Sequence, residues 1–172
     1  MSAPGSGVSV GEVPAAIPLG AFTLDSVLGG GGSGIVWRGR HRRLELPVAA
    51  KVLAPRASRY ALHALKNEVQ AVARLQHPHI IAVLDTGVVD EAAAEASQSR
   101  TRPLVLGSPW MVVELARGGD LHRLAPPCPW GVISDVLRTL LGALAHAHAR
   151  GVIHRDLKPQ NVLLCTDEDE RP

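Results

Sequence analysis

Residues 22–40 read FTLDSVLGGGGSGIVWRGR, a run of glycines between two stretches rich in apolar and β-branched residues. The flanking stretches predict strands at 22–28 and 35–40, and the glycines at 29–34 predict the connection between them. A third apolar stretch, 46–53, follows after a short polar turn. Three strands in a row with short connections predict an antiparallel meander.

Beyond the third strand, the apolar residues recur three and four positions apart. This spacing predicts a helix over 58–75, which ends at His77-Pro78 because the residue before a proline disfavours helical geometry. Further strands are expected at 80–89 and 110–115. Between them, the Ala-, Ser-, Arg- and Pro-containing residues 90–108 predict a surface loop with one helical turn.

The longest predicted helix runs from Trp130 to Arg150, with Gly151 where a C-terminal cap belongs. Its apolar residues cover most of the circumference, so it needs cover on more than one side. Uncovered, this helix would favour aggregation or pairing with a second copy of the chain. Strands first and helices afterwards predict an α+β fold, with a small sheet-based lobe followed by the start of a helical lobe.

The composition is that of an ordinary globular domain. The 172 residues are 46% hydrophobic and carry 18 Lys+Arg against 16 Asp+Glu, a formal charge of +2. These values exclude a disordered chain and a collagen-like repeat, and they leave room for one domain or a small domain plus part of a second. The small charge gives no electrostatic reason to expect a nucleic acid or an anionic membrane as partner.

The ends and the cysteines favour a cytoplasmic protein. Residues 1–16 are rich in Gly, Pro, Ser and Ala, which predicts a flexible leader without the features of a secretory signal. Uninterrupted apolar stretches are too short to span a bilayer. Cys128 and Cys165 do not make a disulfide framework, and we interpret them as free thiols in a reducing compartment.

Two features of the sheet region suggest a site for an anion. A glycine run between strands lets backbone N–H groups approach phosphate oxygens, although such a run is also typical of a flexible turn. Lys51 stands at the end of Val48-Ala49-Ala50-Lys51, in a strand whose neighbouring residues are all apolar, and Lys66 and Lys158 are the chain's other lysines. A lysine in that position needs either an anionic partner, which Glu68 on the following helix can supply, or a side chain that reaches water.

The loop after the long helix concentrates chemically active side chains. Residues 154–161 read His-Arg-Asp-Leu-Lys-Pro-Gln-Asn, and Pro159 predicts that no helix runs through them. Asp156 can accept a hydroxyl proton, Lys158 can neutralise a phosphoryl group, and Asn161 can offer an oxygen to a metal. Any two of these residues alone would fit a polar loop with a salt bridge, but all eight in this order do not.

Together these motifs resemble the eukaryotic-type protein kinases. The resemblance rests on the glycine pattern 29–36, on Val48-Ala49-Ala50-Lys51, on Glu68 and on 154–161, and it covers about residues 18–165. The lysine two residues after the loop aspartate resembles the serine/threonine class, and the arginine-rich composition resembles bacterial members. The resemblance implies a small lobe over 18–116 and the start of the large lobe over 117–172.

For ATP, the resemblance implies a set of nucleotide-binding residues: Leu28, Gly29, Gly31, Gly34, Val36, Ala49, Lys51, Glu114, Ala116 and Asp120. Lys51 would hold the α- and β-phosphates while it pairs with Glu68. Val113 would be the gatekeeper beside the hinge, and Asp120 would reach the ribose.

For catalysis, the resemblance implies that Asp156 orients the substrate hydroxyl, that Lys158 contacts the γ-phosphate and that Asn161 binds Mg²⁺. It also implies an Asp-Phe-Gly triplet after Asn161, and the 172 residues contain none. An acidic run at 167–170 could replace that metal site or form a solvated turn. The sequence predicts a signalling Ser/Thr kinase, present as a fragment of the domain that lacks this segment and is therefore a poor catalyst.

Two alternatives stay open beside an ATP- and Mg²⁺-dependent kinase that phosphorylates Ser and Thr of proteins. One is a non-catalytic ATP-binding or interaction module, and the other is a fragment that does not fold stably. A cooperative thermal unfolding transition would separate the unfolded fragment from the kinase and from the non-catalytic module.

Overall fold

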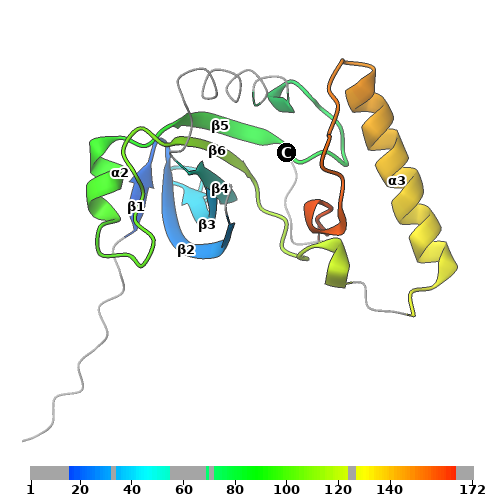
Figure 1. The fold of residues 1–172 in the computed structure, drawn as a ribbon, viewed down its shortest axis with the longest axis horizontal. Helices are drawn as coiled ribbons and strands as arrows, with labels where there is room; N and C mark the ends of the chain where they lie inside the picture. The colour runs from blue at the N-terminus through cyan, green and yellow to red at the C-terminus, as the bar shows by residue number, and fades with distance from the viewer. Residues whose placement is uncertain (1–15, 32–33, 55–68, 70–71, 124–126, 166–172) are drawn as a thin grey trace, which may run out of the picture.

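A computed structural model describes residues 16–31, 34–54, 69, 72–123 and 127–165. Its sheet region is a strongly curled antiparallel sheet with the strand order β1-β2-β3-β4-β6-β5 (Figure 1). The strands are β1 (Ile17–Leu19), β2 (Phe22–Gly31), β3 (Gly34–His41), β4 (Pro47–Leu53), β5 (Val83–Val88) and β6 (Pro109–Glu114). The predicted meander and the α+β class are confirmed, and β1 is a strand that the sequence analysis missed.

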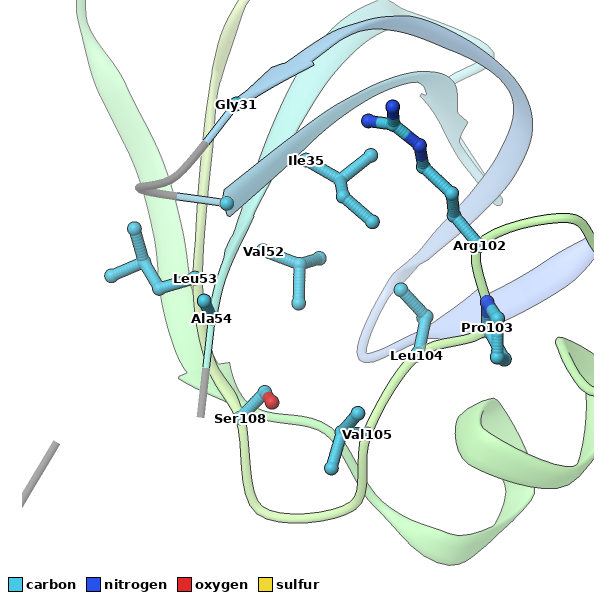
Figure 2. Close-up of a pocket in the computed structure, with 11 residues that line it drawn as sticks. Gly31, Ile35, Val52, Leu53, Ala54, Arg102, Pro103, Leu104, Val105 and Ser108 are labelled. Atoms are coloured by element: carbon cyan, nitrogen blue, oxygen red, sulfur yellow. The ribbon is translucent and has the colours of Figure 1, made fainter. Parts of the chain in front are cut away.

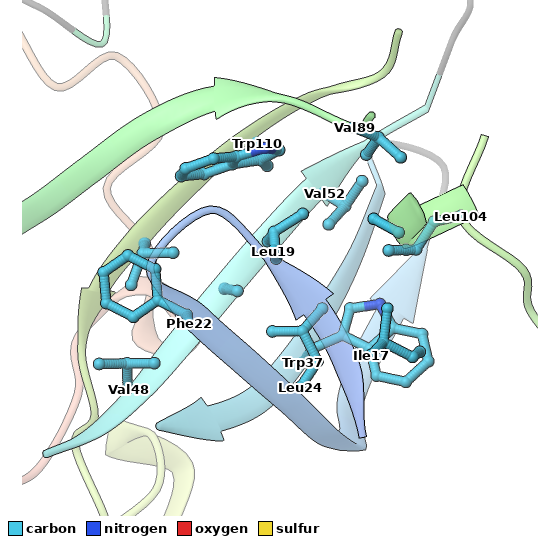
Figure 3. Close-up of a cluster of buried hydrophobic side chains, with 13 residues drawn as sticks. Ile17, Leu19, Phe22, Leu24, Trp37, Val48, Val52, Val89, Leu104 and Trp110 are labelled. Atoms are coloured by element: carbon cyan, nitrogen blue, oxygen red, sulfur yellow. The ribbon is translucent and has the colours of Figure 1, made fainter. Parts of the chain in front are cut away.

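Alternation along the strands separates a buried face from an exposed one. In β4 the residues Val48, Ala50 and Val52 are buried while their neighbours are partly exposed, as expected for a period of two. Figure 3 shows the side chains of the buried face gathered inside the curl of the sheet. This core consists of Ile17, Leu19, Phe22, Leu24, Trp37, Val48, Ala50, Val52, Val89, Ala93, Leu104, Trp110 and Val112.

The prediction of a surface loop at 90–108 is partly wrong. Helix α2 (Glu91–Ala96) begins after Asp90, whose carboxylate caps it by accepting a hydrogen bond from the Ala93 amide at 2.8 Å. The segment is also part of the core, because Ala93 and Leu104 are buried against the sheet. It therefore covers one end of the sheet instead of projecting from it.

The large-lobe part consists of α3 (Trp130–His148) and two short 3₁₀ helices, η1 (Leu121–Arg123) and η2 (Pro159–Asn161). Gly151 follows α3 with a φ of 74°, which suits the glycine predicted for the cap. The expectation that Pro159 excludes helix is wrong in one respect, because η2 begins at Pro159. Proline is tolerated at a first helical position, where its missing N–H is not needed.

Several predictions fall on residues outside those described. They are most of the leader 1–16, most of the helix 58–75 with Lys66 and Glu68, and the acidic run 167–170. Val69, Val72 and Ala73 are described and are helical. Cys128 and Cys165 are free cysteines, as expected.

Candidate active site

The strand register places Lys51 on the face of the sheet opposite the core. Lys51 pairs across the sheet with Val36 on one side and Met111 on the other, and directly paired residues point to the same face. The neighbouring Ala50 pairs with Trp37 and is buried. Ala49 alternates in the same way, so Val36, Ala49 and Lys51 line one partly exposed face.

The glycine-rich connection extends this face. Gly29 pairs with Val36, and a side chain added at Gly29 or Gly31 would meet nothing within 4 Å. Leu28 beside them is 50% exposed. The backbone of β2 is therefore open to a ligand along its last residues, which is the access that phosphate oxygens need.

Gly34 has a different role in the same connection. Its φ is 143°, and a Cβ there would lie 2.9 Å from the Cα of Leu53 and would overlap the carbonyl oxygen of Val52. Glycine is thus required at this position by close backbone packing between β3 and β4.

The end of β6 is anchored to the segment before β5. The Glu114 amide donates to the Ala82 carbonyl at 3.2 Å, and the Glu114 carboxylate accepts from the Ala82 amide at 3.0 Å. Val113, the predicted gatekeeper, pairs with Ala49 on the Lys51 face. Ala116 follows the strand and is partly exposed. These contacts fix the course of the predicted hinge.

A short backbone ladder joins the residues after the hinge to those after the loop 154–161. The Gly118 amide donates to the Leu164 carbonyl at 2.9 Å, and the Leu164 amide donates to the Gly119 carbonyl at 2.8 Å. Asp120 forms a bridge with Leu163, and its carboxylate caps η1 by accepting from the His122 amide at 3.1 Å. Segments 43 to 46 positions apart along the chain therefore lie side by side, and this pairing connects the loop to the hinge.

Within the loop, Asp156 is held by two side chains. Lys158 Nζ lies 2.7 Å from Asp156 Oδ2. The Asn161 amide nitrogen donates to the Asp156 carbonyl at 2.7 Å and to Oδ2 at 3.0 Å. The turn itself is closed by the Asp156 amide, which donates to the His154 carbonyl at 2.8 Å, and Arg155 adopts a φ of 61°. The three predicted loop residues are thus brought together.

These contacts stabilise the charged form of Asp156. The hydrogen bond from Lys158 and then that from Asn161 lower the pKa of the Asp156 carboxyl below its usual range, because both donors stabilise the carboxylate. The Lys158 and Asp156 side chains are 47% and 64% exposed, so the ion pair orients the groups more than it stabilises the fold. At neutral pH the loop presents a carboxylate beside an ammonium group.

The sheet face and the loop are placed separately. Among the described residues, no hydrogen bond or ion pair joins Lys51 to the loop 154–161, and Glu68 is outside them. The part of the chain that the structure describes contains no group of three or more His, Cys, Asp or Glu side chains that could hold a metal. Within that part, no helix is long and apolar enough to span a membrane.

Two contributors to this region are not predicted from the sequence. The ladder between 118–119 and 164 carries no local pattern, since strand pairing over such a distance is invisible in hydrophobic periodicity. Arg102, from the 90–108 segment, reaches the glycine-rich connection, where its guanidinium Cζ is 3.6 Å from the position of a Cβ on Gly30. The sequence shows an arginine before Pro103, but it does not indicate that the side chain lies beside Gly30.

Comparison with known proteins identifies relatives of this chain. A family model described as "Protein kinase domain" matches residues 22–171. The serine/threonine-protein kinase PknL of Mycobacterium tuberculosis is 37% identical over 166 residues, which cover 88% of this chain and 37% of PknL. The serine/threonine-protein kinase pkn3 of Myxococcus xanthus is 31% identical over 148 residues, which cover 83% of this chain and 24% of pkn3.

Solved structures give the same result for the fold. The crystal structure of the M. tuberculosis PknI kinase domain matches with a TM-score of 0.68 and 28% sequence identity. The match covers 90% of this chain and 57% of the PknI chain. The chain therefore spans little more than half of that kinase-domain structure. It spans little more than a third of the length of PknL and about a quarter of the length of pkn3.

Proposed function

The chain belongs to the protein kinase family, with bacterial serine/threonine kinases among its relatives, and on that premise we propose that it transfers the γ-phosphoryl group of ATP to Ser and Thr hydroxyls of proteins. The observation that carries the proposal is the geometry of Asp156, Lys158 and Asn161. One carboxylate, one ammonium and one amide meet within hydrogen-bonding distance on a loop fixed to the hinge.

ATP would bind between the exposed sheet face and this loop. The apolar Leu28, Val36 and Ala49 supply surfaces that suit an adenine ring, and backbone groups of Glu114 and Ala116 would bind its edge. Gly29, Gly31 and Gly34 let the backbone approach the phosphates. Lys51 supplies the positive charge for the α- and β-phosphates, with Glu68 as its proposed partner, and Asp120 is the proposed ribose contact.

The loop residues would carry the transfer itself. Asp156 accepts a hydrogen bond from the substrate hydroxyl and directs its oxygen toward the γ-phosphorus. Because the pKa of Asp156 is lowered, the group is a carboxylate at neutral pH and can accept the hydrogen bond that orients the hydroxyl. It would take the hydroxyl proton as the bond to phosphorus forms. Lys158 stands beside it, where it can neutralise charge on the transferring oxygens.

Mg²⁺ is the proposed metal, and the donor set fits it in part. Asn161 uses its amide nitrogen toward Asp156, which leaves its side-chain oxygen, a hard ligand of the kind Mg²⁺ prefers. Magnesium usually keeps several waters and takes phosphate oxygens as further ligands, so a single protein oxygen is a usable contribution. When bound, the ion supplies charge neutralisation at the phosphates.

The remaining assignments are proposed on the likeness to the family. We place the small lobe at 18–116 and the start of the large lobe at 117–172, with the hinge between them. Protein substrates with Ser or Thr and a signalling role in the cytoplasm accompany the kinase assignment, and neither nucleic acid nor a membrane is proposed as partner.

A second candidate is a non-catalytic ATP-binding or interaction module. It would need only the sheet face of Val36, Ala49 and Lys51, which the strand register brings together. In that case Lys51 and the glycine-rich connection would still bind ATP, and transfer would not occur.

The test is transfer of label from [γ-³²P]ATP to casein in the presence of Mg²⁺. We expect Asp156→Asn to reduce the rate at least about 100-fold, because it removes the group that orients the hydroxyl. Asp135→Asn is the matched control, since Asp135 is an exposed carboxylate on α3, and it should leave the rate unchanged. Transfer that survives Asp156→Asn contradicts the proposal. ATP binding that depends on Lys51 without any transfer replaces it with the second candidate.

A further inference from the structure

A cavity of about 270 Å³ lies behind the glycine-rich connection. Figure 2 shows it between the ends of β3 and β4 on one side and the segment 102–108 on the other. Gly31 and Gly34 form its edge, where β2 passes into β3. The cavity is therefore built partly by the segment that covers the sheet and partly by the glycine-rich connection itself.

This cavity is distinct from the proposed ATP site because it opens on the other face of the sheet. Ile35 and Val52, which line it, pair directly with each other. They alternate with Val36 and Lys51, which also pair and which point to the opposite face. A ligand in the cavity and a nucleotide beside Lys51 would thus be separated by the same two strands.

The walls are apolar, with one cation at the edge. Arg102 is the one charged residue among the described residues of the lining, and the buried Ser108 adds a hydroxyl. The other lining side chains are those of Ile35, Val52, Leu53, Ala54, Pro103, Leu104 and Val105.

The guanidinium of Arg102, which is an exposed residue, is placed at the backbone of β2. It lies against Gly30, in the space that the missing side chain leaves open, with Cζ 3.6 Å from where a Cβ would be. No hydrogen bond or ion pair joins Arg102 to any other described residue, whereas the neighbouring Arg100 donates to the Asp25 carbonyl at 3.4 Å. A guanidinium beside an apolar cavity, without a counter-ion among the described residues, offers five donors to an anion.

We propose that this cavity binds a small amphipathic anion, with a carboxylate or phosphate head at Arg102 and an apolar body against Val52 and Leu104. The volume of about 270 Å³ holds about nine non-hydrogen atoms, at roughly 30 Å³ for each. The charge of the head is set by Arg102, and the apolar body is set by the walls. A neutral polar ligand fits neither feature, and a cation does not fit Arg102.

A ligand bound in this cavity would change the contacts of Gly30, Gly31 and Gly34. An anion that draws the guanidinium toward the cavity removes it from Gly30, and the same ligand contacts Gly31 and Gly34. A change in ATP affinity on binding is therefore expected, and this consequence alone rests on the proposed function.

Octanoate is a suitable probe because it has a carboxylate and ten non-hydrogen atoms. Octanamide has the same number of atoms and no charge, and octyl phosphate tests the other head group. Methyl NMR signals of Val52, Leu104 and Val105 report binding at the cavity without ATP or transfer, so this test and that of the proposed function fail independently. We expect saturable shifts of these methyls with octanoate, and at least tenfold weaker binding of octanamide.

Arg102→Gln should weaken octanoate binding at least tenfold and leave octanamide unchanged. Arg43→Gln is the control, since Arg43 is exposed in the turn between β3 and β4 and does not line the cavity. Val105→Asp, a change at a side chain 47% exposed, places a competing carboxylate at the edge and should also weaken octanoate binding. Equal affinity for octanoate and octanamide, equal affinity of the Arg102→Gln variant and the unmodified chain, or no saturable shift would each overturn the proposal.

Discussion

The Asn161 side chain binds Asp156 twice, at its backbone carbonyl (2.7 Å) and at carboxylate Oδ2 (3.0 Å). Oδ2 also receives Lys158 at 2.7 Å, and Oδ1 accepts no hydrogen bond from any described residue. One oxygen of the carboxylate is thus used to hold it in place. The other is available for the hydroxyl that the proposed reaction presents.

Replacing Asn161 by alanine is predicted to raise the pKa of Asp156. The substitution removes the second of the two hydrogen bonds that stabilise the carboxylate, while the bond from Lys158 remains. A carbon-detected NMR titration of the Asp156 carboxyl measures this directly. An unchanged pKa would mean that Asn161 does not stabilise the charge.

The lowered pKa of Asp156 also predicts how the stability of the fold depends on pH. The folded state lowers the pKa of Asp156. The resulting stabilisation is therefore complete at pH values above the pKa of Asp156 in the unfolded state, and it is lost as the pH falls through the pKa in the folded state. The difference in stability between the unmodified chain and Asn161→Ala should therefore narrow in acid. Widening of that difference below pH 4 would contradict this sign.

The glycines of the connection are predicted to differ in their tolerance of alanine. Gly34→Ala should cost about 1–3 kcal/mol of unfolding free energy, because it combines a positive φ with a clash against β4. Gly29→Ala should change it by less than about 1 kcal/mol, because the added methyl meets nothing within 4 Å. Urea unfolding of both variants gives the comparison, and equal losses would show that the backbone at Gly34 is not constrained.

His146 is predicted to make stability depend on pH. The imidazole of His146 lies 5.0 Å from that of His77, and its Nε2 is buried without a hydrogen-bond partner. Desolvation, then the charge of Arg150, then that of His77 lower the pKa of His146. Protonation of His146 is therefore less favourable in the folded state than in the unfolded state. The contribution of His146 to stability is complete at pH values above its ordinary pKa of 6.5 and falls as the pH drops below that pKa.

The measurement is the melting temperature between pH 7.5 and pH 5. His146→Leu should reduce its change over this range, and His148→Leu should not, because His148 is exposed on α3. If both variants keep the pH dependence of the unmodified chain, His146 is not its source.

Helix α3 is predicted to promote self-association. Its exposed apolar side chains form an uncovered surface: Trp130, Val132, Ile133, Leu137 and Leu141. Leu141, which is 64% exposed, should tolerate replacement by glutamate within about 0.5 kcal/mol of stability, and the variant should associate less in sedimentation velocity. Ala143→Glu should instead cost at least about 2 kcal/mol, since Ala143 is 7% exposed. Unchanged association in Leu141→Glu would exclude this face as the contact between copies.

Much of the fold was predictable because its signals are local. The glycine run between two apolar stretches predicted β2 and β3, and a continuous helical pattern predicted α3 to within a few residues at its C-terminal end. The cluster of Asp156, Lys158 and Asn161 was predictable from their spacing on a proline-containing loop. Short-range spacing is where sequence and geometry correspond most closely.

The parts that were not predictable depend on distant contacts. β1 has only three residues and is stabilised by pairing with β2, so its own sequence carries little signal. The 90–108 segment was predicted as a surface loop because it is a long stretch that contains Ala, Ser, Arg and Pro, yet Ala93 packs in the core where small side chains fit. Whether Lys51 and Glu68 pair stays a prediction, because Glu68 is outside the described residues.

The most direct test of the account is whether the sheet face and the loop share one nucleotide. Mn²⁺ in place of Mg²⁺ broadens NMR signals close to it, so Mn²⁺ with ATP can be located from both sides. We expect the methyl signals of Val36 and Ala49 and the side-chain amide signal of Asn161 to broaden together, and Lys51→Met to abolish the effect at the two methyls. Broadening of Asn161 alone, with Val36 and Ala49 unaffected at saturating ATP, would contradict the account.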